Sequence, residues 1–176
     1  AGSFNTLQNQ AFIETSLTLV GNSLASKEIN GGFQNAANVS LKIYSSTDTL
    51  LTKRYNVIGP AFTNSLNAPS FIDIQRYPLQ NGFYTIQVIV TDNYHDLKKS
   101  VVHYQKIKVK FNSDQLCTSS IQIVESYSKS QKQSALSKSG LDLVPYTVNY
   151  FPESINHLIF YVETYHADTV LGKDQS

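Results

Sequence analysis

Few residues of this chain have types and spacings suited to metal chemistry. His95 and His103 flank one expected hairpin, where their imidazoles could approach each other as ligands. A protein metal centre needs further Cys, His or acidic ligands at familiar spacings, and none accompanies this pair. Asp92, Asn93 and Asp96 carry the oxygen atoms that Ca²⁺ prefers, but Asp and Asn also favour turns by bonding to nearby backbone. We interpret both groups as structural and expect no cofactor.

Signatures of a nucleophilic enzyme are missing from the sequence. It has no Gly-x-Ser-x-Gly motif. Ser126 to Lys129 has the Ser-x-x-Lys spelling, but it runs from an expected strand into a polar stretch rather than along a helix. Glu125 and Glu163 could be read as the paired carboxylates of a glycosidase. Both lie on alternating stretches, which favours solvent-facing positions instead, so we expect no enzymatic activity.

Two groups of side chains could contact a partner. Lys106, Lys108 and Lys110 alternate along one face of an expected strand with Tyr104 in register, and such a stripe suits an anionic partner. The same lysines would also keep an edge strand from pairing with a neighbouring sheet. Aromatic faces suit sugar CH groups, although packing is the commoner role of tyrosines at period-two spacing. The tyrosines that could form a sugar-stacking platform are Tyr146, Tyr150, Tyr161 and Tyr165.

Composition limits the classes of partner. The formal net charge of +1 is too small for the overall field to drive binding to nucleic acid or to an anionic membrane. No apolar run approaches the ~20 residues that span a bilayer, so we expect no transmembrane segment. Charged residues make up 15% of the chain, a low share that leaves much of the surface to Ser, Thr, Asn and Gln, as in many secreted β proteins. Cys117 is the only cysteine, which excludes an internal disulfide.

The elements that must hold these residues are organised around the stretch 79–92. Between residues 83 and 91 apolar and mostly polar residues alternate, which predicts a strand with one buried and one wet face. The Asn81-Gly82 pair marks its start, because both residues tolerate tight turns. Tyr84 lies two residues after this turn, as in the tyrosine corner of Greek-key sandwiches, where the phenol bonds to upstream backbone. We therefore expect structural roles for Gly82 and Tyr84.

Further alternating stretches predict the strands that cover this one. They are 12–20, 39–43, 50–58, 71–77 and 101–111. Glu14 falls on the polar side of the first, and the ambiguous faces of 50–58 suit an edge strand. The number and spacing of these strands are those of an immunoglobulin-like antiparallel β-sandwich, so the expected fold class is all-β. We expect this sandwich to occupy residues 1–112.

The rest of the chain predicts a second, smaller β region. Residues 113–119 are polar and lack apolar periodicity, and we place a linker there. Beyond it, strands are expected at 120–127, 146–150 and 158–165. The Ser/Lys/Gln-rich run 128–140 cannot bury much and predicts a mobile loop. Three strands are too few for an independent sandwich, so we expect residues 120–176 to open a partial second β domain or to lean on the first.

The order of these motifs resembles the secreted Bacteroidetes proteins that carry a GWxTD domain. Their N-terminal half has a strand of the type Leu-Pro-x-Gly-x-Tyr, then a Ser-Asp-Ile-like segment, a Pro and a Phe-Tyr-x-Glu-Ile-Tyr-like strand. The matching residues here are Leu79, Gly82, Tyr84, Asp92, Ser120, Ile121, Pro145 and the strand from Phe160 to Tyr165. They span about half of the chain, and each piece is degenerate.

The departures shape what this resemblance implies. No Gly-Trp-x-Thr-Asp motif occurs, because Trp is absent, and Ser120 stands where the family has Asp. The resemblance therefore implies the N-terminal immunoglobulin-like region of such a protein, or a relative without that domain. It also implies a periplasmic, outer-membrane-associated or extracellular location, and no known activity.

Three functional hypotheses follow from the sequence. The leading one is a non-catalytic interaction or spacer module of an envelope or secreted protein, with an unknown protein or glycan as partner. The alternative is a carbohydrate-binding module that uses exposed, coplanar tyrosine rings. A third is a fragment of an enzyme whose active site lies past residue 176. The exposure of the tyrosines separates the first two.

Overall fold

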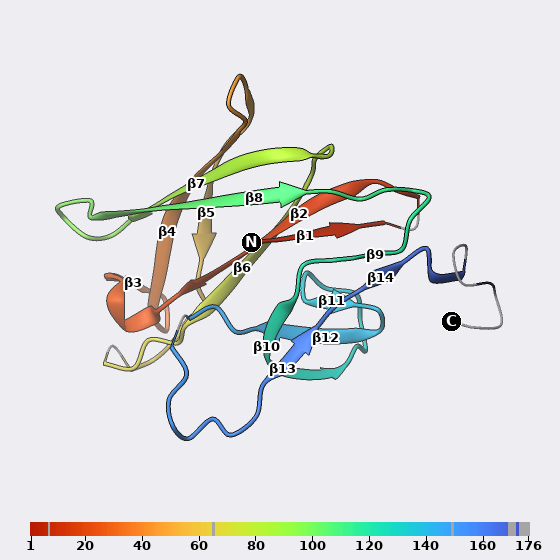
Figure 1. The fold of residues 1–176 in the computed structure, drawn as a ribbon. Helices are drawn as coiled ribbons and strands as arrows, with labels where there is room; N and C mark the ends of the chain where they lie inside the picture. The colour runs from red at the N-terminus through yellow and green to blue at the C-terminus, as the bar shows by residue number, and fades with distance from the viewer. Residues whose placement is uncertain (7, 65, 149, 169–171, 173–176) are drawn as a thin grey trace. The chain divides into compact units, whose positions relative to one another are not determined.

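The computed structural model of this chain describes residues 1–6, 8–64, 66–148, 150–168 and 172. It is all-β, with antiparallel strands joined into several sheets, as the alternating patterns predicted (Figure 1). This architecture is consistent with a β-sandwich, and its immunoglobulin-like topology stays a prediction.

The chain divides into two compact units, each assembled from segments that are separated in the sequence. The first unit comprises Ala1–Ser16, Ile74–Asn81 and Val109–Ser176, and the second unit comprises Leu17–Asp73 and Gly82–Lys108. We expected contiguous parts instead, with boundaries at residues 112 and 119. Those boundaries stay a prediction about which parts of the chain fold independently.

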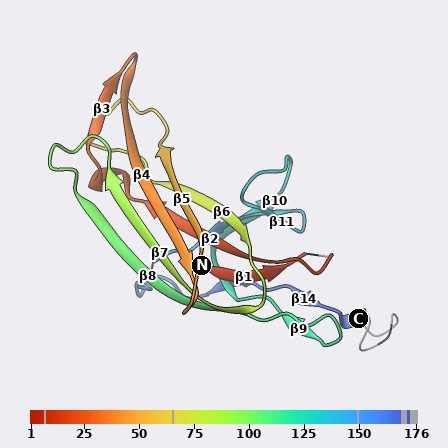
Figure 2. The same ribbon diagram turned by 90° about the horizontal axis from the view of Figure 1, so that it is seen from above.

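The second unit contains a five-stranded sheet built around β4 (Gly32–Tyr44). β4 pairs with β5 (Thr49–Ile58) and β7 (Gly82–Asp92) along most of its length, and its first residues pair with β3 (Ser26–Ile29). β8 (Ser100–Val109) follows β7 at the end of the order β3-β4-β7-β8. Figures 1 and 2 both show β8 beside β7, and Figure 2 shows β8 as the outermost strand of this sheet. β5 lies at another edge, where it pairs with β4, as expected for 50–58.

Alternate residues of β4 form the core of the second unit. Val39, Leu41 and Ile43 are at most 1% exposed, as their spacing predicted. Ile43 lies opposite Ile86 of β7, which is also buried. Because side chains alternate along a strand, the residues between these core positions face the opposite, outward side of the sheet.

The start of β7 depends on a close approach between Gly82 and Tyr84. Tyr84 is buried, and an ideal Cβ at position 82 would lie 2.7 Å from its hydroxyl oxygen. Glycine therefore leaves the space that the phenol occupies. The structural role expected for Gly82 has this steric basis, while the tyrosine corner stays a prediction.

The first unit contains smaller sheets. One joins β1 (Gly2–Asn5), β2 (Ala11–Leu19) and β6 (Phe71–Pro78), with β2 in the middle, although β2 and β6 also carry residues of the second unit. Another has the order β11-β12-β10-β13, formed by Ser137–Lys138, Leu141–Pro145, Gln122–Lys129 and Ile159–Tyr161. β9 (Cys117–Thr118) pairs with β14 (Thr164–Tyr165).

The prediction that 128–140 is a loop with little burial is wrong. β10 continues to Lys129, and β11 pairs with β12. Both residues of β11, Ser137 and Lys138, are buried. The polar composition suggested exposure to solvent. Instead, Ser137 bonds to Asp142 and Lys138 pairs with Glu14 inside the unit.

The prediction of a strand at 146–150 is also wrong for its described residues. The strand lies earlier, as β12, whose Leu143 is buried and whose last residue is Pro145. Proline has no N–H and cannot continue the ladder. After it, the Tyr146 hydroxyl donates a hydrogen bond to the carbonyl of Tyr150 and closes a loop. The stretch 158–165 is likewise divided between β13 and β14.

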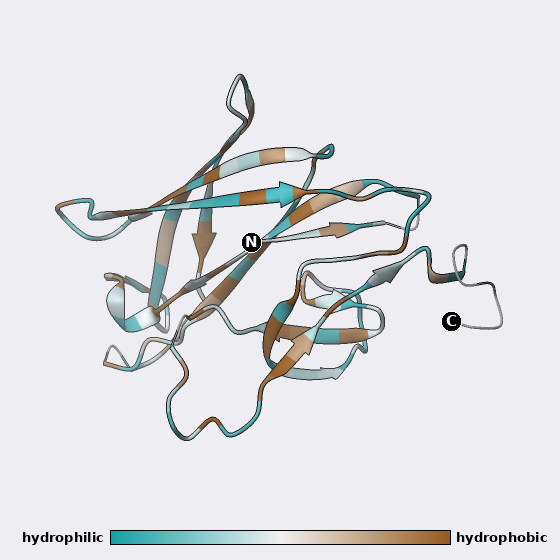
Figure 3. Ribbon diagram, in the orientation of Figure 1, coloured by the Kyte–Doolittle hydropathy of each residue, from teal (hydrophilic) through white to brown (hydrophobic). Residues whose placement is uncertain are grey.

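Strands β10 and β13 carry apolar side chains on the surface. Brown segments mark both strands in Figure 3. Phe160 of β13 is 63% exposed and lies opposite Ile123 of β10, while Ile121 just before β10 is 68% exposed. Because residues two apart share a face, these side chains leave one side of this strand pair apolar.

Candidate functional site

The outward face of the sheet in the second unit collects basic side chains from separate strands. Lys42 of β4 lies between the buried Leu41 and Ile43, so its side chain faces outward. Arg54 of β5 lies opposite Ser40 of β4, which shares the outward side with Lys42. The pairing of β4 with β5 thus brings together two cations that are distant in the sequence.

β8 contributes the next basic residues. Gln87 of β7 lies opposite Lys42, and its side-chain amide donates a 2.6 Å hydrogen bond to the Tyr104 hydroxyl. This contact places Tyr104 on the outward side, together with Lys106 and Lys108, which follow at spacings of two residues. Tyr104 is 57% exposed, and both lysines are exposed. The stripe therefore lies on the surface, as its alternation predicted.

We name the four outward basic residues Lys42, Arg54, Lys106 and Lys108 the cationic face. Two of its ammonium groups lie over aromatic rings. The Lys108 Nζ atom is 5.2 Å from the centroid of Phe83, and the Lys42 Nζ atom is 5.4 Å from that of Tyr44. Such cation–π contacts hold the long side chains along the sheet surface rather than extended into water.

No carboxylate interrupts this face among the described outward residues of β4, β5, β7 and β8. Those residues are Ala36, Asn38, Ser40, Lys42, Tyr44, Thr52, Arg54, Asn56, Ile58, Phe83, Thr85, Gln87, Ile89, Thr91, Ser100, Val102, Tyr104, Lys106 and Lys108. Since the whole chain has a formal net charge of only +1, the positive charge is local. Edge protection explains lysines on β8 but not Lys42, which lies on an interior strand.

Lys110 is not part of the cationic face as defined. It follows β8 directly and is exposed, but it belongs to the first unit. The structure thus brings Tyr104, Lys106 and Lys108 together with Lys42 and Arg54. Lys42 and Arg54 were not among the predicted residues, because only the pairing of β5, β4, β7 and β8 places them on the same sheet face as the β8 stripe.

Two of the expected sugar-stacking tyrosines lie in the loop after β12. The rings of Tyr146 and Phe151 stack with centroids 5.0 Å apart and planes 13° apart. Phe151 is 41% exposed and Tyr150 is 70% exposed. This loop therefore presents aromatic surface to solvent, with Phe151 as a member that the sequence pattern missed.

The other two tyrosines are tied to a carboxylate. The Tyr161 hydroxyl donates to Glu163 Oε1 at 2.7 Å, and the Tyr165 hydroxyl donates to Oε2 of the same residue. The Tyr165 hydroxyl also accepts a 3.0 Å bond from the backbone N–H of Asn5. Burial, followed by the contact with Glu163, raises the pKa of Tyr161 to about 12, and the pKa of Tyr165 also rises.

This arrangement also changes the interpretation of Glu163. We expected a solvent-facing side chain, yet Glu163 is half-buried and both carboxylate oxygens accept tyrosine hydroxyls. Glu125 is exposed, as expected. Glu163 is thus a hydrogen-bonding centre of the first unit, and its geometry is that of a structural carboxylate.

A buried ionic cluster in the first unit has no counterpart in the sequence-based predictions. Glu14 is 3% exposed, although its alternation placed it on the polar side of its strand. Its carboxylate lies 2.8 Å from Arg76 Nε and 2.8 Å from Lys138 Nζ. Lys138 Nζ also donates to Gln122 Oε1 at 2.7 Å. Burial, despite the opposing effect of Glu14, lowers the pKa of Lys138.

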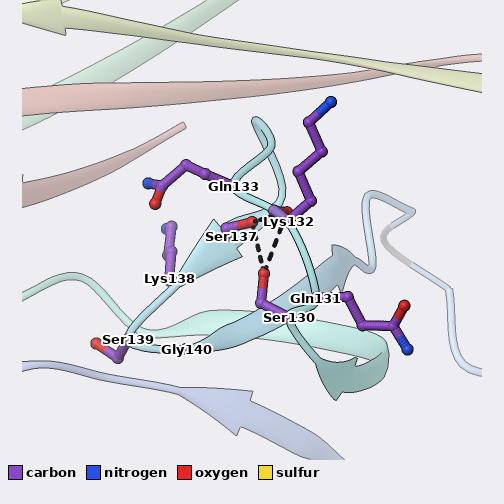
Figure 4. A pocket seen from close by; sticks show the side chains of 8 residues that line it. All are labelled: Ser130, Gln131, Lys132, Gln133, Ser137, Lys138, Ser139 and Gly140. Carbon is purple, nitrogen blue, oxygen red and sulfur yellow. Dashed lines mark hydrogen bonds between the residues drawn. The ribbon is translucent and has the colours of Figure 1, made fainter.

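A shallow depression of about 270 Å³ lies over the turn that joins β10 to β11 (Figure 4). It is lined by Ser130, Gln131, Lys132, Gln133, Ser137, Lys138, Ser139 and Gly140. Ser130 and Ser137 donate to Asp142 Oδ1 at 2.8 and 2.5 Å, and these bonds lower the pKa of that carboxyl. The Lys138 ammonium group lies 2.8 Å from Glu14 Oε1 and is paired with that carboxylate. The network explains the local fold rather than a reaction.

The residues considered for calcium have a structural use. Asp92 is buried, and its carboxylate accepts hydrogen bonds from the backbone N–H groups of Ala25, Tyr94 and His95 at 2.7 to 3.2 Å. Across the part of the chain that the structure describes, no three His, Cys, Asp or Glu residues gather in a way that could hold a metal ion. Asp92 thus fixes the turn after β7, as an Asp in a turn commonly does.

Comparison with protein-family models, curated proteins and solved structures found no match to this chain. Within the described ranges, no helix has both the length and the apolar character needed to cross a membrane. The candidate site therefore rests on the geometry of the chain itself, and its most coherent surface is the cationic face.

Proposed function

We propose that this chain is a non-catalytic interaction module that binds an anionic macromolecular partner through the cationic face. The observation that carries the proposal is the gathering of Lys42, Arg54, Lys106 and Lys108 on one sheet face without a carboxylate among its described outward residues. Complementary charge steers encounter and selects partners of the opposite sign. A sheet face offers a broad contact surface rather than a pocket, which suits a macromolecule.

The proposed location is the cell envelope or the exterior of a bacterium. Its support is the resemblance to the N-terminal immunoglobulin-like region of GWxTD-type proteins, together with the low share of charged residues, 15%. In that setting the chain serves as an interaction or spacer module beside further domains. The partner is then an envelope protein or glycan that carries negative charge.

Binding of labelled poly-glutamate, followed by fluorescence anisotropy, tests this proposal. We expect the double variant Lys106→Glu and Lys108→Glu to bind roughly tenfold more weakly or worse, because it reverses two of the four charges of the cationic face. Lys129→Glu with Lys132→Glu is the matched control, since both lysines are exposed and the net-charge change is the same. Equal losses in the two variants, or no binding by the wild-type chain, would refute the role of the cationic face.

Salt dependence gives a second readout. Exposed charges are screened strongly once the ionic strength reaches about 0.15 M, where the Debye length is ~8 Å. Affinity for poly-glutamate should therefore fall steadily as salt rises. A turnover assay that showed catalysis by the chain alone would contradict the non-catalytic part of the proposal.

The alternative function is carbohydrate binding by the loop after β12. Its support is the stacked pair Tyr146 and Phe151 beside the exposed Tyr150. Tyr150→Ala and Phe151→Ala would then weaken binding to an uncharged oligosaccharide panel, while Lys106→Glu would not. Binding of poly-glutamate with no response to any neutral sugar favours the cationic face instead.

A further inference from the structure

Within the described residues no strand pairs with the outer edge of β8, and the start of this strand is unusually apolar. β8 pairs with β7 and stands last in the strand order. Val101, Val102 and Tyr104 are 71, 48 and 57% exposed, so the first half of the strand is uncovered on both faces. Soluble proteins usually shorten, bend or charge an edge of this kind, because its backbone can pair with another strand.

Contacts between β7 and β8 define which backbone groups face that edge. The N–H of Asp92 donates to the carbonyl of Lys99 at 3.0 Å, and the Gln87–Tyr104 and Phe83–Lys108 contacts fit the same antiparallel register. Residues of an antiparallel strand direct their backbone groups alternately toward and away from the neighbour. In this register the edge-facing groups belong to Val102, Tyr104, Lys106 and Lys108.

These four residues also share the outward side of the sheet. A strand laid along the edge would therefore meet a row of backbone donors and acceptors, and beside it two apolar or aromatic side chains followed by two cations. Peptide strands satisfy such an edge by adding themselves to the sheet, while alternate side chains supply specificity. An anionic glycan could pair with the charges of Lys106 and Lys108. It has no regular row of amide N–H and C=O groups, however, to form hydrogen bonds with the strand edge.

We propose that β8 binds an extended acidic peptide segment as an additional antiparallel strand. Four alternate positions of that segment carry the specificity. From its N-terminus, the first two of these positions are acidic and the last two are apolar. The acidic pair meets Lys108 and Lys106, and the apolar pair meets Tyr104 and Val102. This inference deepens the proposed function and rests on it, since the lysines of β8 belong to the cationic face.

A synthetic peptide tests the pairing. From its N-terminus the peptide carries Glu, Glu, Val and Val at alternate positions, with threonine at the positions between them. Its binding to the full chain is measured by calorimetry. One control exchanges the positions of Glu and Val at constant composition. The other carries N-methyl groups on the amides that would face β8, which removes its donors but keeps its charge. Both controls should bind roughly tenfold more weakly or worse than the parent.

Val102→Pro provides the complementary change in the protein. Its N–H faces the open edge, so proline removes a donor from the new ladder while sparing the pairing with β7. We expect roughly tenfold weaker binding than with Val102→Thr, which keeps the N–H. Amide exchange supplies a readout that does not depend on this variant folding: the amides of Val102, Tyr104 and Lys106 should gain protection when the parent peptide binds.

The outcomes separate this inference from the proposed function. If the N-methylated peptide and poly-glutamate bind as well as the parent, and Lys106→Glu weakens all three, the cationic face stands and strand addition is refuted. If neither the parent peptide nor poly-glutamate binds, both proposals fail. Sedimentation showing that the chain dimerises through β8 would also overturn the inference, because a second copy would then occupy the edge.

Discussion

The Lys138 ammonium lies 2.8 Å from Glu14 Oε1, although the two side chains are only 7 and 2% exposed. The same ammonium lies 3.6 Å from the centroid of the Phe4 ring. A cation and an anion taken out of water depend on each other, since either one alone would be a buried and uncompensated charge. Arg76 reaches Glu14 from the partly exposed side of the cluster.

Breaking this pair should destabilise the chain strongly. We expect Glu14→Gln to lower the free energy of unfolding by about 3–5 kcal/mol, because Lys138 keeps its charge without its anion. The double variant Glu14→Leu with Lys138→Met should recover most of that loss, since it removes both charges and leaves apolar volume. Urea unfolding of the single and double variants measures both effects. A double variant no more stable than Glu14→Gln would show that the pair is not coupled.

Gly82 should not tolerate a side chain while Tyr84 keeps its hydroxyl. The ideal Cβ would lie 2.7 Å from Tyr84 Oη, so Gly82→Ala should cost about 1–3 kcal/mol of stability through overpacking. Tyr84→Phe alone should cost about 1–3 kcal/mol if the buried hydroxyl makes the expected bond to backbone. Combined, the two changes should cost less than their sum, because the oxygen that crowds the new methyl group is gone. A fully additive result would argue against this contact.

Limited trypsin digestion should cut first after Lys132. Lys132 is exposed in the turn between β10 and β11, whereas Lys138 is buried and Lys129 pairs with Leu141. Exposed loop tips are the preferred sites of nicking. Mass spectrometry of the earliest fragments identifies the site, and Lys132→Gln should delay the first cut. Initial cleavage after Lys138, or within β7, would contradict the burial described above.

Alkaline pH should weaken the first unit through Tyr161 and Tyr165. The pKa of Tyr161 rises from 10.0 to about 12 on folding, so the unfolded chain releases this proton first. The stabilisation is complete below pH 10 and is lost as pH rises from about 10 toward 12. Tyr161→Phe with Tyr165→Phe should therefore lose less stability than the wild type between those values. Urea titrations at matched pH compare the two, and parallel slopes would contradict the raised pKa values of these tyrosines.

Local pattern was enough to predict the strands whose two faces differ. On β4 the spacing of Val39, Leu41 and Ile43 alone predicted the buried side. The exposed row of Tyr104, Lys106 and Lys108 was predictable for the same reason, because side chains alternate along any strand. Neither inference needed to know which strands are neighbours.

The pattern failed where burial comes from distant segments. Glu14 lies on the side of its strand that the alternation predicted to face solvent. Lys138 lies in a run whose composition predicted a loop. Each charge is compensated by the other in the folded chain. The two residues are far apart in the sequence, so no local pattern predicts that they pair. The strand at 146–150 was misplaced for a related reason, since the pairing of β12 with β10 and β11 selects Leu141–Pro145 instead.

The sequence by itself determined an all-β chain, the faces of its regular strands and the basic stripe on β8. Tertiary structure alone decided that Lys42 and Arg54 share the sheet face of that stripe, that Tyr161 and Tyr165 bind one carboxylate, and that Glu14 and Lys138 are buried together. The physical reason is the separation in sequence between the residues that interact. Alternation acts between residues two apart, whereas strand order and charge pairing are settled by contacts between residues far apart in the chain.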